Sequence, residues 1–412
     1  MAPRARLPLV LRDRNMAAIW SGQVLSQAGT RMYQISLAWW IVTQSAEGGR
    51  DLGLFMAVGA APALLLVKPL GRLIDERRAK ALLILSDLAS FALVSGLGLA
   101  FAYGSPGLPS VLLSGLLVAS CAAVFDPTLN TALPAAVGSE DIEEAVAFQS
   151  STQSLASFGG AVAGALLIDR LGLVGVIWLN AASFLASAVC NALLKLSPKA
   201  RTPARDEDPA LSTWSLLQGM PLIPRILAGF GLTNFFLTPV LVVLPLYVEH
   251  TLRASAGVLG RLEAGVWLGL LGGTFAAPWL RTSNTLALGS ACVAAMGLSL
   301  AVPGLIEDQG VVLGALFMAG AALGVNNVKF LAYFQEQIPP ELKGRFFALM
   351  QAVLGVSYPA AFLLFGILAD RVSPPAVFLI QGFGILVVSA YFLHLSTQQP
   401  PAGAPSSAQA PS

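Results

Sequence analysis

Long runs of apolar residues, separated by short polar segments, recur along nearly the whole chain. A membrane-spanning helix needs about 20 apolar residues to cross about 30 Å of hydrocarbon, since each residue rises about 1.5 Å. Strands with alternating polarity, which are typical of a membrane barrel, do not occur. The pattern predicts an all-α polytopic membrane protein. Its twelve predicted transmembrane helices are 16–43, 52–72, 81–103, 109–132, 147–168, 173–195, 221–247, 255–279, 284–304, 311–333, 346–369 and 374–396.

The composition agrees with a membrane protein and excludes several function classes. Of the 412 residues 56% are hydrophobic and only 11% are charged, whereas a soluble domain has about 25% charged residues. The net charge of +2 argues neither for nor against nucleic acid, and we expect no such partner. The three cysteines all fall inside predicted spans, so we expect free thiols. No metal-ligand spacing, catalytic constellation or phosphate-binding loop occurs, so we expect no metal, no cofactor and no enzyme.

Basic residues predict how the chain is oriented. With the N-terminus in the cytoplasm, sixteen Lys and Arg residues lie in cytoplasmic segments and four lie in outside loops. Cytoplasmic loops of membrane proteins carry this excess of positive charge. Because the number of predicted spans is even, we expect both termini in the cytoplasm.

Two polar segments divide the chain. Residues 197–219 are rich in proline and mixed charge, as in "SPKARTPARDEDPALST", which predicts a flexible cytoplasmic linker. The tail at 400–412 has low complexity, so we expect it to be disordered. This organisation predicts an N-terminal six-helix half at 1–196 and a C-terminal six-helix half at 220–399.

The two halves also resemble each other. "ALLIDRLG" at 165–172 and "GILADRVS" at 366–373 align at an offset of 201 residues. The same offset places Asp126 on Asn327 and Lys80 on Arg281. Transporters are often built from such repeats, with the binding site between them near the bilayer midplane. The repeat predicts two pseudo-symmetric bundles.

The loop after the second span, "GRLIDERRAK" at 71–80, concentrates charge in an otherwise apolar chain. A Gly-x-x-x-Asp sequence followed by clustered bases at this place resembles the major facilitator superfamily (MFS). "SGQVLSQAGTRMYQISLAWWIV", "FDPTLNTALPAAV", "LNAASFLASA" and "EQIPPELKGRFFAL" resemble its macrolide-efflux and siderophore-export branch. The resemblance implies the MFS fold, alternating access and a cytoplasmic conformational gate. The gate residues that we expect are Gly71, Asp75, Arg77, Arg78, Lys80 and Asp126.

Three departures from the family pattern bear on coupling. Glu76 stands where a basic residue is usual, and Thr30 follows Gly29 where members of the branch often have Asp. Ala161 replaces the proline that exporters often carry in the fifth span. The second departure removes one candidate proton carrier, and the third weakens the motif-based case for antiport.

The first span carries four polar residues on one helical face: Gln23, Gln27, Arg31 and Gln34. An arginine at the bilayer centre costs about 2.5–3.5 kcal/mol on insertion scales. The stripe therefore either lines a wet cavity or forms a hydrogen-bonded seam between helices. First spans line the central pathway in the resembled family, which favours the cavity. We expect the same cavity to include Asn234, Thr238 and Asn327. Asp126 lies near a span end, where capping or gate contacts are as well supported as substrate contacts.

Glu263 in the eighth predicted span is a candidate for ion coupling. It either pairs with Arg31 or Arg261 as a structural bridge, or carries a proton, which requires a desolvated and unpaired carboxyl. Gly265, Gly269 and Gly273 in the same span predict close helix packing rather than substrate binding.

These features predict a secondary active transporter in a bacterial cytoplasmic membrane, embedded in lipid and acting as a monomer. We expect it to export an amphipathic small molecule, such as a drug, a siderophore or a lipid-like metabolite, by proton-coupled alternating access. Arg31 suggests that this substrate is anionic. Two alternatives stay open: an organic-anion uptake symporter, and a non-transporting sensor or scaffold on the same fold.

Overall fold

The computed structural model describes residues 8–66, 76–104, 106–137, 141–196, 220, 222–282, 284–339 and 342–398, and the regular elements in these ranges are helices. The first half contains α1 (Leu9–Arg12), α2 (Arg14–Gln44), α3 (Gly48–Leu65), α5 (Glu76–Tyr103), α6 (Leu108–Ala136) and α7 (Ile142–Ala192). The second contains α9 (Leu222–Leu237), α10 (Val240–Leu246), α11 (Ala256–Ala276), α12 (Thr285–Ala301), α13 (Gln309–Gln337), α14 (Lys343–Ala369) and α15 (Pro374–Ser396).

Each predicted span coincides with one of these helices, and two of them have notable breaks. The fifth and sixth spans are joined in α7, which changes direction at Gly172, where a φ of +66° is tolerated because glycine has no Cβ. The seventh span is interrupted between α9 and α10 at Pro239, which has no amide hydrogen to continue the helix, and it ends in a short π-helix at Tyr247–Thr251. The described helix ends lie within a few residues of the predicted boundaries, except that two predicted spans form one kinked element and the seventh is interrupted. The predicted end of the second span lies outside the described residues.

Eight helical segments in the described ranges are long and apolar enough to cross a membrane. The described parts of α2, α3, α11 and the first portion of α7 are less apolar than these. Across the halves α7 packs on α11 and α3 packs on α14, whereas α2 packs on α7 within the first half. Several of their glycines, such as Gly53 of α3 and Gly269 of α11, lie directly against the backbone of a neighbouring helix, which accounts for part of the lower hydropathy. The chain is thus an integral membrane protein with the predicted helical fold.

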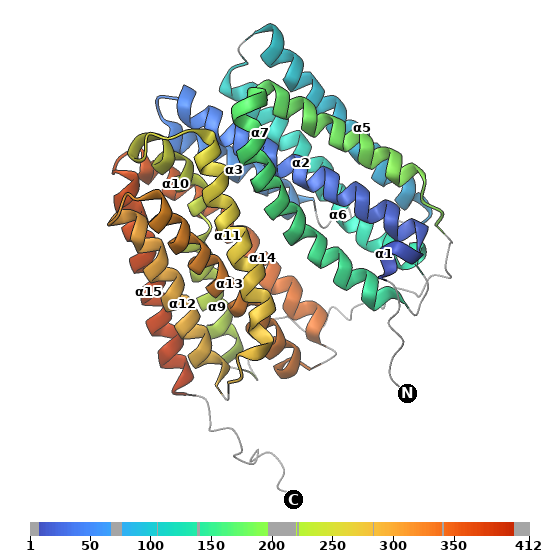
Figure 1. The fold of residues 1–412 in the computed structure, drawn as a ribbon. Helices are drawn as coiled ribbons and strands as arrows, with labels where there is room; N and C mark the ends of the chain where they lie inside the picture. The colour runs from blue at the N-terminus through green and yellow to red at the C-terminus, as the bar shows by residue number, and fades with distance from the viewer. Residues whose placement is uncertain are drawn as a thin grey trace, which may run out of the picture.

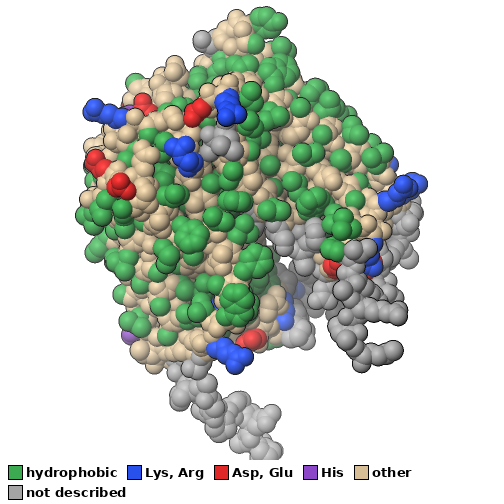
Figure 2. All heavy atoms as spheres, in the orientation of Figure 1, with side chains coloured by type: hydrophobic (Ala, Val, Ile, Leu, Met, Phe, Trp, Pro, Cys, Tyr) green, Lys and Arg blue, Asp and Glu red, His purple; other side chains and the backbone are tan. Residues whose placement is uncertain are grey.

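The helices form two bundles, one from each side of the 197–219 segment (Figure 1). On the face seen in Figure 2, hydrophobic side chains are spread over both bundles, and the charged side chains lie mainly near the ends of the bundles. The hydrophobic surface suits contact with lipid chains. The predicted linker at 197–219 and the predicted tail at 400–412 lie outside the described residues.

The bundles meet at the end of the molecule away from the described termini, which we call the closed end (Figure 1). There α3 lies against α14 with almost no side chain between them, because a Cβ on Gly53 would meet the carbonyl oxygen of Phe362. Beside this contact, Ala256 at the start of α11 packs with Ile168 and Val176 of α7. Toward the termini the bundles diverge, and Figure 2 shows a hollow between them.

Candidate functional site

A cavity of about 620 Å³ lies between the bundles, mostly within the N-terminal half. Its walls come from α2, α3, α5 and α6, and α7 contributes Phe184. The C-terminal half closes it with Leu241 of α10, Trp267 of α11 and Phe362 of α14. The lining mixes aromatic and aliphatic side chains with a few polar groups, which is the usual composition of a small-molecule site.

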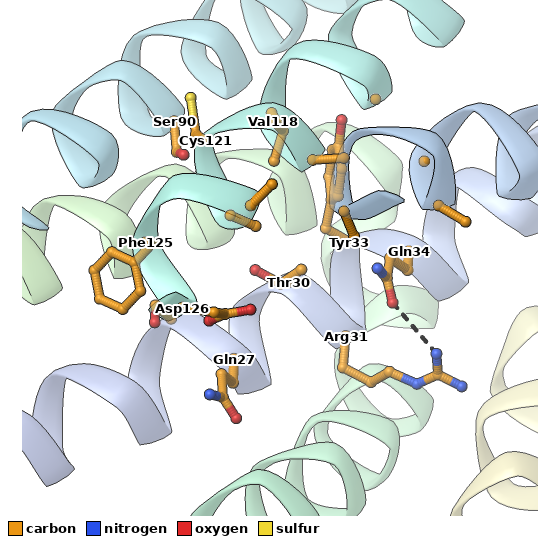
Figure 3. Close-up of a pocket in the computed structure, with 18 of the residues that line it drawn as sticks. Gln27, Thr30, Arg31, Tyr33, Gln34, Ser90, Val118, Cys121, Phe125 and Asp126 are labelled. Atoms are coloured by element: carbon orange, nitrogen blue, oxygen red, sulfur yellow. Dashed lines mark hydrogen bonds between the residues drawn. The ribbon is translucent and has the colours of Figure 1, made fainter. Parts of the chain in front are cut away.

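The polar stripe of α2 lines this cavity along its length (Figure 3). Gln27 donates a hydrogen bond through Nε2 to Oε1 of Gln23, one turn earlier. Arg31 donates from Nη1 to Oε1 of Gln34 at 3.3 Å. These two bonds run along one face of α2 and do not join it to another helix, and the stripe that they connect lines the cavity.

Arg31 forms an ion pair with Glu263 across the interface between the halves. Nη2 of Arg31 donates to Oε2 of Glu263, and the two side chains are only 10% and 5% exposed. The guanidinium also lies over the ring of Trp267, with Cζ 5.3 Å from the ring centroid. The structure therefore pairs Glu263 with Arg31, while Arg261 is exposed. The charges of the pair cancel, which removes the uncompensated cation on which the expectation of an anionic substrate rested.

Asp87 on α5 lines the same cavity, and the sequence analysis did not single it out. Its side chain is 3% exposed and accepts a hydrogen bond from Nδ2 of Asn191 at 2.8 Å. A signal was available, because an aspartate in the middle of an apolar span is a functional pointer by default. Asp126 on α6 lies across from Gln27 and is open to the cavity (Figure 3). Among the described residues no ion pair involves either carboxylate.

The remaining predicted cavity residues lie elsewhere. Asn234 donates to the carbonyl oxygen of Phe230 at 3.0 Å and accepts from the hydroxyl of Tyr358 at 3.4 Å, so its amide ties α9 to α14. Thr238 lies at the break between α9 and α10, and Asn327 is exposed on α13. None of these three is among the residues that line the cavity.

The predicted gate is only partly described. Gly71 and Asp75 lie outside the described residues, as does the side chain of Arg77. Arg78 is exposed, and Lys80 donates from Nζ to the carbonyl oxygen of Leu194 at 2.8 Å. Lys80 therefore ties the start of α5 to the end of α7 within one half. Asp126, the sixth predicted gate residue, lines the cavity.

Curated relatives match the chain along most of its length. Macrolide efflux protein A of Streptococcus pyogenes is 23% identical over 388 residues, which cover 90% of this chain and 93% of that protein. The multidrug efflux pump Tap of Mycolicibacterium fortuitum is 24% identical over 372 residues, which cover 86% of this chain and 90% of the pump.

Solved structures share the fold at low sequence identity. A variant of the nucleoside transporter NupG superposes with a TM-score of 0.74 at 12% identity, covering 92% of this chain and 99% of that one. A bacterial homologue of the iron transporter ferroportin in an inward-facing state gives a TM-score of 0.70 at 15% identity, covering 93% and 99%. The profile of the Major Facilitator Superfamily matches residues 19–361. The chain therefore belongs to the Major Facilitator Superfamily of transporters.

Proposed function

We propose that this transporter exports an amphipathic small molecule from the cytoplasm of a bacterium. The observation that carries the proposal is the cavity between the halves, which lies beneath a closed end and beside the hollow on the side of the termini. With the termini in the cytoplasm, as the basic residues predict, a molecule would enter this cavity from inside. The efflux names of two relatives agree with this direction.

The charges around the cavity favour a substrate that carries an amine. The ion pair between Arg31 and Glu263 contributes no net charge, whereas Asp87 and Asp126 contribute two carboxylates without ion-pair partners among the described residues. Burying a cation beside such groups costs less than burying an anion. Phe184, Phe362 and Trp267 offer faces to the apolar part of the same molecule. An anionic substrate is the competing class.

Coupling to protons is part of the proposal. A proton carrier needs a carboxyl that is not held ionised by a nearby cation. Glu263 does not meet this condition, because Arg31 donates directly to it. Asp87 and Asp126 are the better candidates within the described cavity, since each lines it without a cation partner.

Proteoliposomes that contain the purified protein test direction, coupling and substrate charge together. We expect an imposed pH gradient to drive a lipophilic ammonium dye across the membrane, from the cytoplasmic face of the protein to its outer face. A protonophore should abolish this movement. Movement of a lipophilic sulfonate instead would favour the anionic class, and movement in the opposite sense would favour an uptake symporter. A sensor or scaffold would move neither dye.

The matched variants are Asp126→Asn and Asp308→Asn. Asp126 lines the cavity, whereas Asp308 lies at the closed end and accepts a hydrogen bond from the amide of Val311 in its own half. We expect only the first variant to lose transport of the ammonium dye. Equal loss in both variants would contradict the assignment of the cavity carboxylates.

A further inference from the structure

The repeated segments at 165–172 and 366–373 place an aspartate at equivalent positions of the two halves, Asp169 and Asp370. Asp169 lies just before the change of direction at Gly172, and Asp370 is the residue that follows the last turn of α14. Both are at the closed end, where the halves meet. Neither aspartate lines the cavity, so the proposed binding site does not explain why both halves carry one at this position.

Asp370 binds the first turn of α3, which belongs to the other half. Its Oδ1 accepts from the amide of Gly49 and its Oδ2 accepts from the amide of Arg50, both at 2.8 Å. The first amide groups of a helix have no partner within the helix, and a carboxylate there also complements the helix dipole. Glu47, the N-cap residue of α3, makes no capping bond with its side chain. The cap of α3 therefore comes from the opposite half.

The backbone is shaped for this contact. A Cβ on Gly49 would lie 2.5 Å from the carbonyl oxygen of Gly366 and 2.7 Å from Oδ1 of Asp370. No larger residue fits at this position without moving α3 away from α14. Glycine at 49 and at 366 thus lets the carboxylate reach both amides.

Asp169 makes the corresponding contact on the other side of the molecule. Its Oδ2 accepts from the hydroxyl of Ser255 at 3.3 Å. Ser255 is the N-cap residue of α11, and its side chain makes no capping bond within that helix. The contact again joins the end of a helix in one half to the start of a helix in the other. It consists of one longer hydrogen bond where Asp370 makes two short ones.

We propose that Asp370 and Asp169 are two symmetry-related latches that hold the closed end shut. Each latch exists only while the halves touch at this end, so each stabilises this conformer relative to one that is open there. This inference rests on the proposed alternating access, because it says which of the two conformers of that cycle the contacts stabilise. Because Asp370 makes two short bonds to amides, its latch is the stronger of the two.

Spin-label distances test the proposal on the full chain in lipid nanodiscs. Labels are attached after Tyr103→Cys and Leu305→Cys substitutions in a chain whose three native cysteines are replaced. Both positions are strongly exposed and lie in different halves at the closed end. Loss of a helix cap predicts that Asp370→Ala raises the ratio of open to closed conformers about 2- to 30-fold. Asp169→Ala is expected to raise it less.

Asp308→Ala is the matched control. Asp308 accepts from the amide of Val311 at 2.9 Å, so its removal deletes a carboxylate cap at the same end, but one within a single half. We expect the distance distribution of this variant to match the unsubstituted chain. An unchanged distribution in Asp370→Ala, or an equal shift in Asp308→Ala, overturns the proposal.

Amide hydrogen exchange covers the case in which Asp370→Ala does not fold. In Asp370→Asn one acceptor oxygen remains, so one of the amides of Gly49 and Arg50 should exchange faster while the rest of α3 keeps its protection. Unchanged protection of both amides overturns the latch. If the unsubstituted chain showed one label-to-label distance under all conditions, that result would count against alternating access. Amide hydrogen exchange at Gly49 and Arg50 would still decide whether Asp370 caps α3.

Discussion

The ion pair between Arg31 and Glu263 makes the sharpest energetic prediction. In Glu263→Gln the guanidinium of Arg31 stays buried, with its side chain 10% exposed, but loses its counter-charge. Two unit charges at 4 Å attract by about 4 kcal/mol at an effective dielectric of 20, and removing one partner of a buried pair costs about 3–5 kcal/mol. The ring of Trp267 lies over Arg31 before and after the substitution, so it does not change this difference. We therefore expect Glu263→Gln to destabilise the protein by about 3–5 kcal/mol.

A double-mutant cycle measured by unfolding in mixed detergent micelles checks this value. The combined Arg31→Met and Glu263→Met chain removes both charges and should cost far less than either single change, because neither charge is left buried alone. Arg261→Gln is the control, since Arg261 is exposed on the same helix, and we expect a change within about 0.5 kcal/mol. Additive single and double effects, or a Glu263→Gln chain as stable as the control, would refute the reasoning.

Three further predictions concern packing, the buried carboxylate and access. Gly273→Ala should lower the melting temperature because the new Cβ would enter the backbone of α13, whereas Gly272→Ala, which has open space around it, should leave it unchanged. Asn191→Ala should cost about 1–3 kcal/mol by stranding the carboxylate of Asp87, and adding Asp87→Asn should recover part of that loss in the same melting assay. Cys121 lines the cavity, so in inside-out vesicles it should react with a membrane-impermeant maleimide faster than Cys292, the buried cysteine of α12. Equal reaction rates would contradict a cavity that is open to the cytoplasm.

The number and the places of the spans could be predicted because hydropathy over about 20 residues is a local property. The kink of α7 at Gly172 could not, since two apolar spans joined by a left-handed glycine read as two helices separated by a loop. The four helices that fall below the hydropathy of the others were still found, because their polar positions are confined to one face or one end. α2 is the clearest case, with its stripe interrupting an otherwise apolar run.

The site was harder to predict because its chemistry depends on distant pairings. Arg31 and its stripe could be located from helical periodicity alone. The neutralisation of Arg31 could not be established, since Glu263 is 232 residues away and could equally pair with Arg261 or carry a proton. Asp87 was not predicted for a different reason, because it is a single charged residue in its predicted span, without the helical repeat that marks the stripe of α2. Asn234 shows how a polar residue on an expected lining helix can bond to its own helix and to a neighbouring one, through Phe230 of α9 and Tyr358 of α14.

The repeat shows why symmetry within a sequence can locate a residue without revealing what it does. Aligning the halves places Asp169 on Asp370, which alone indicates only that both derive from one ancestral position. Among the described residues of its own half, neither aspartate has a side-chain hydrogen-bond or ion-pair partner. Their partners, Ser255 and the amides of α3, belong in each case to the opposite half. A pair of contacts related by the same pseudo-symmetry appears only when the halves are docked at the closed end. The duplicated aspartates are therefore best understood as a property of the interface, and a transporter that opens this interface must break both contacts together.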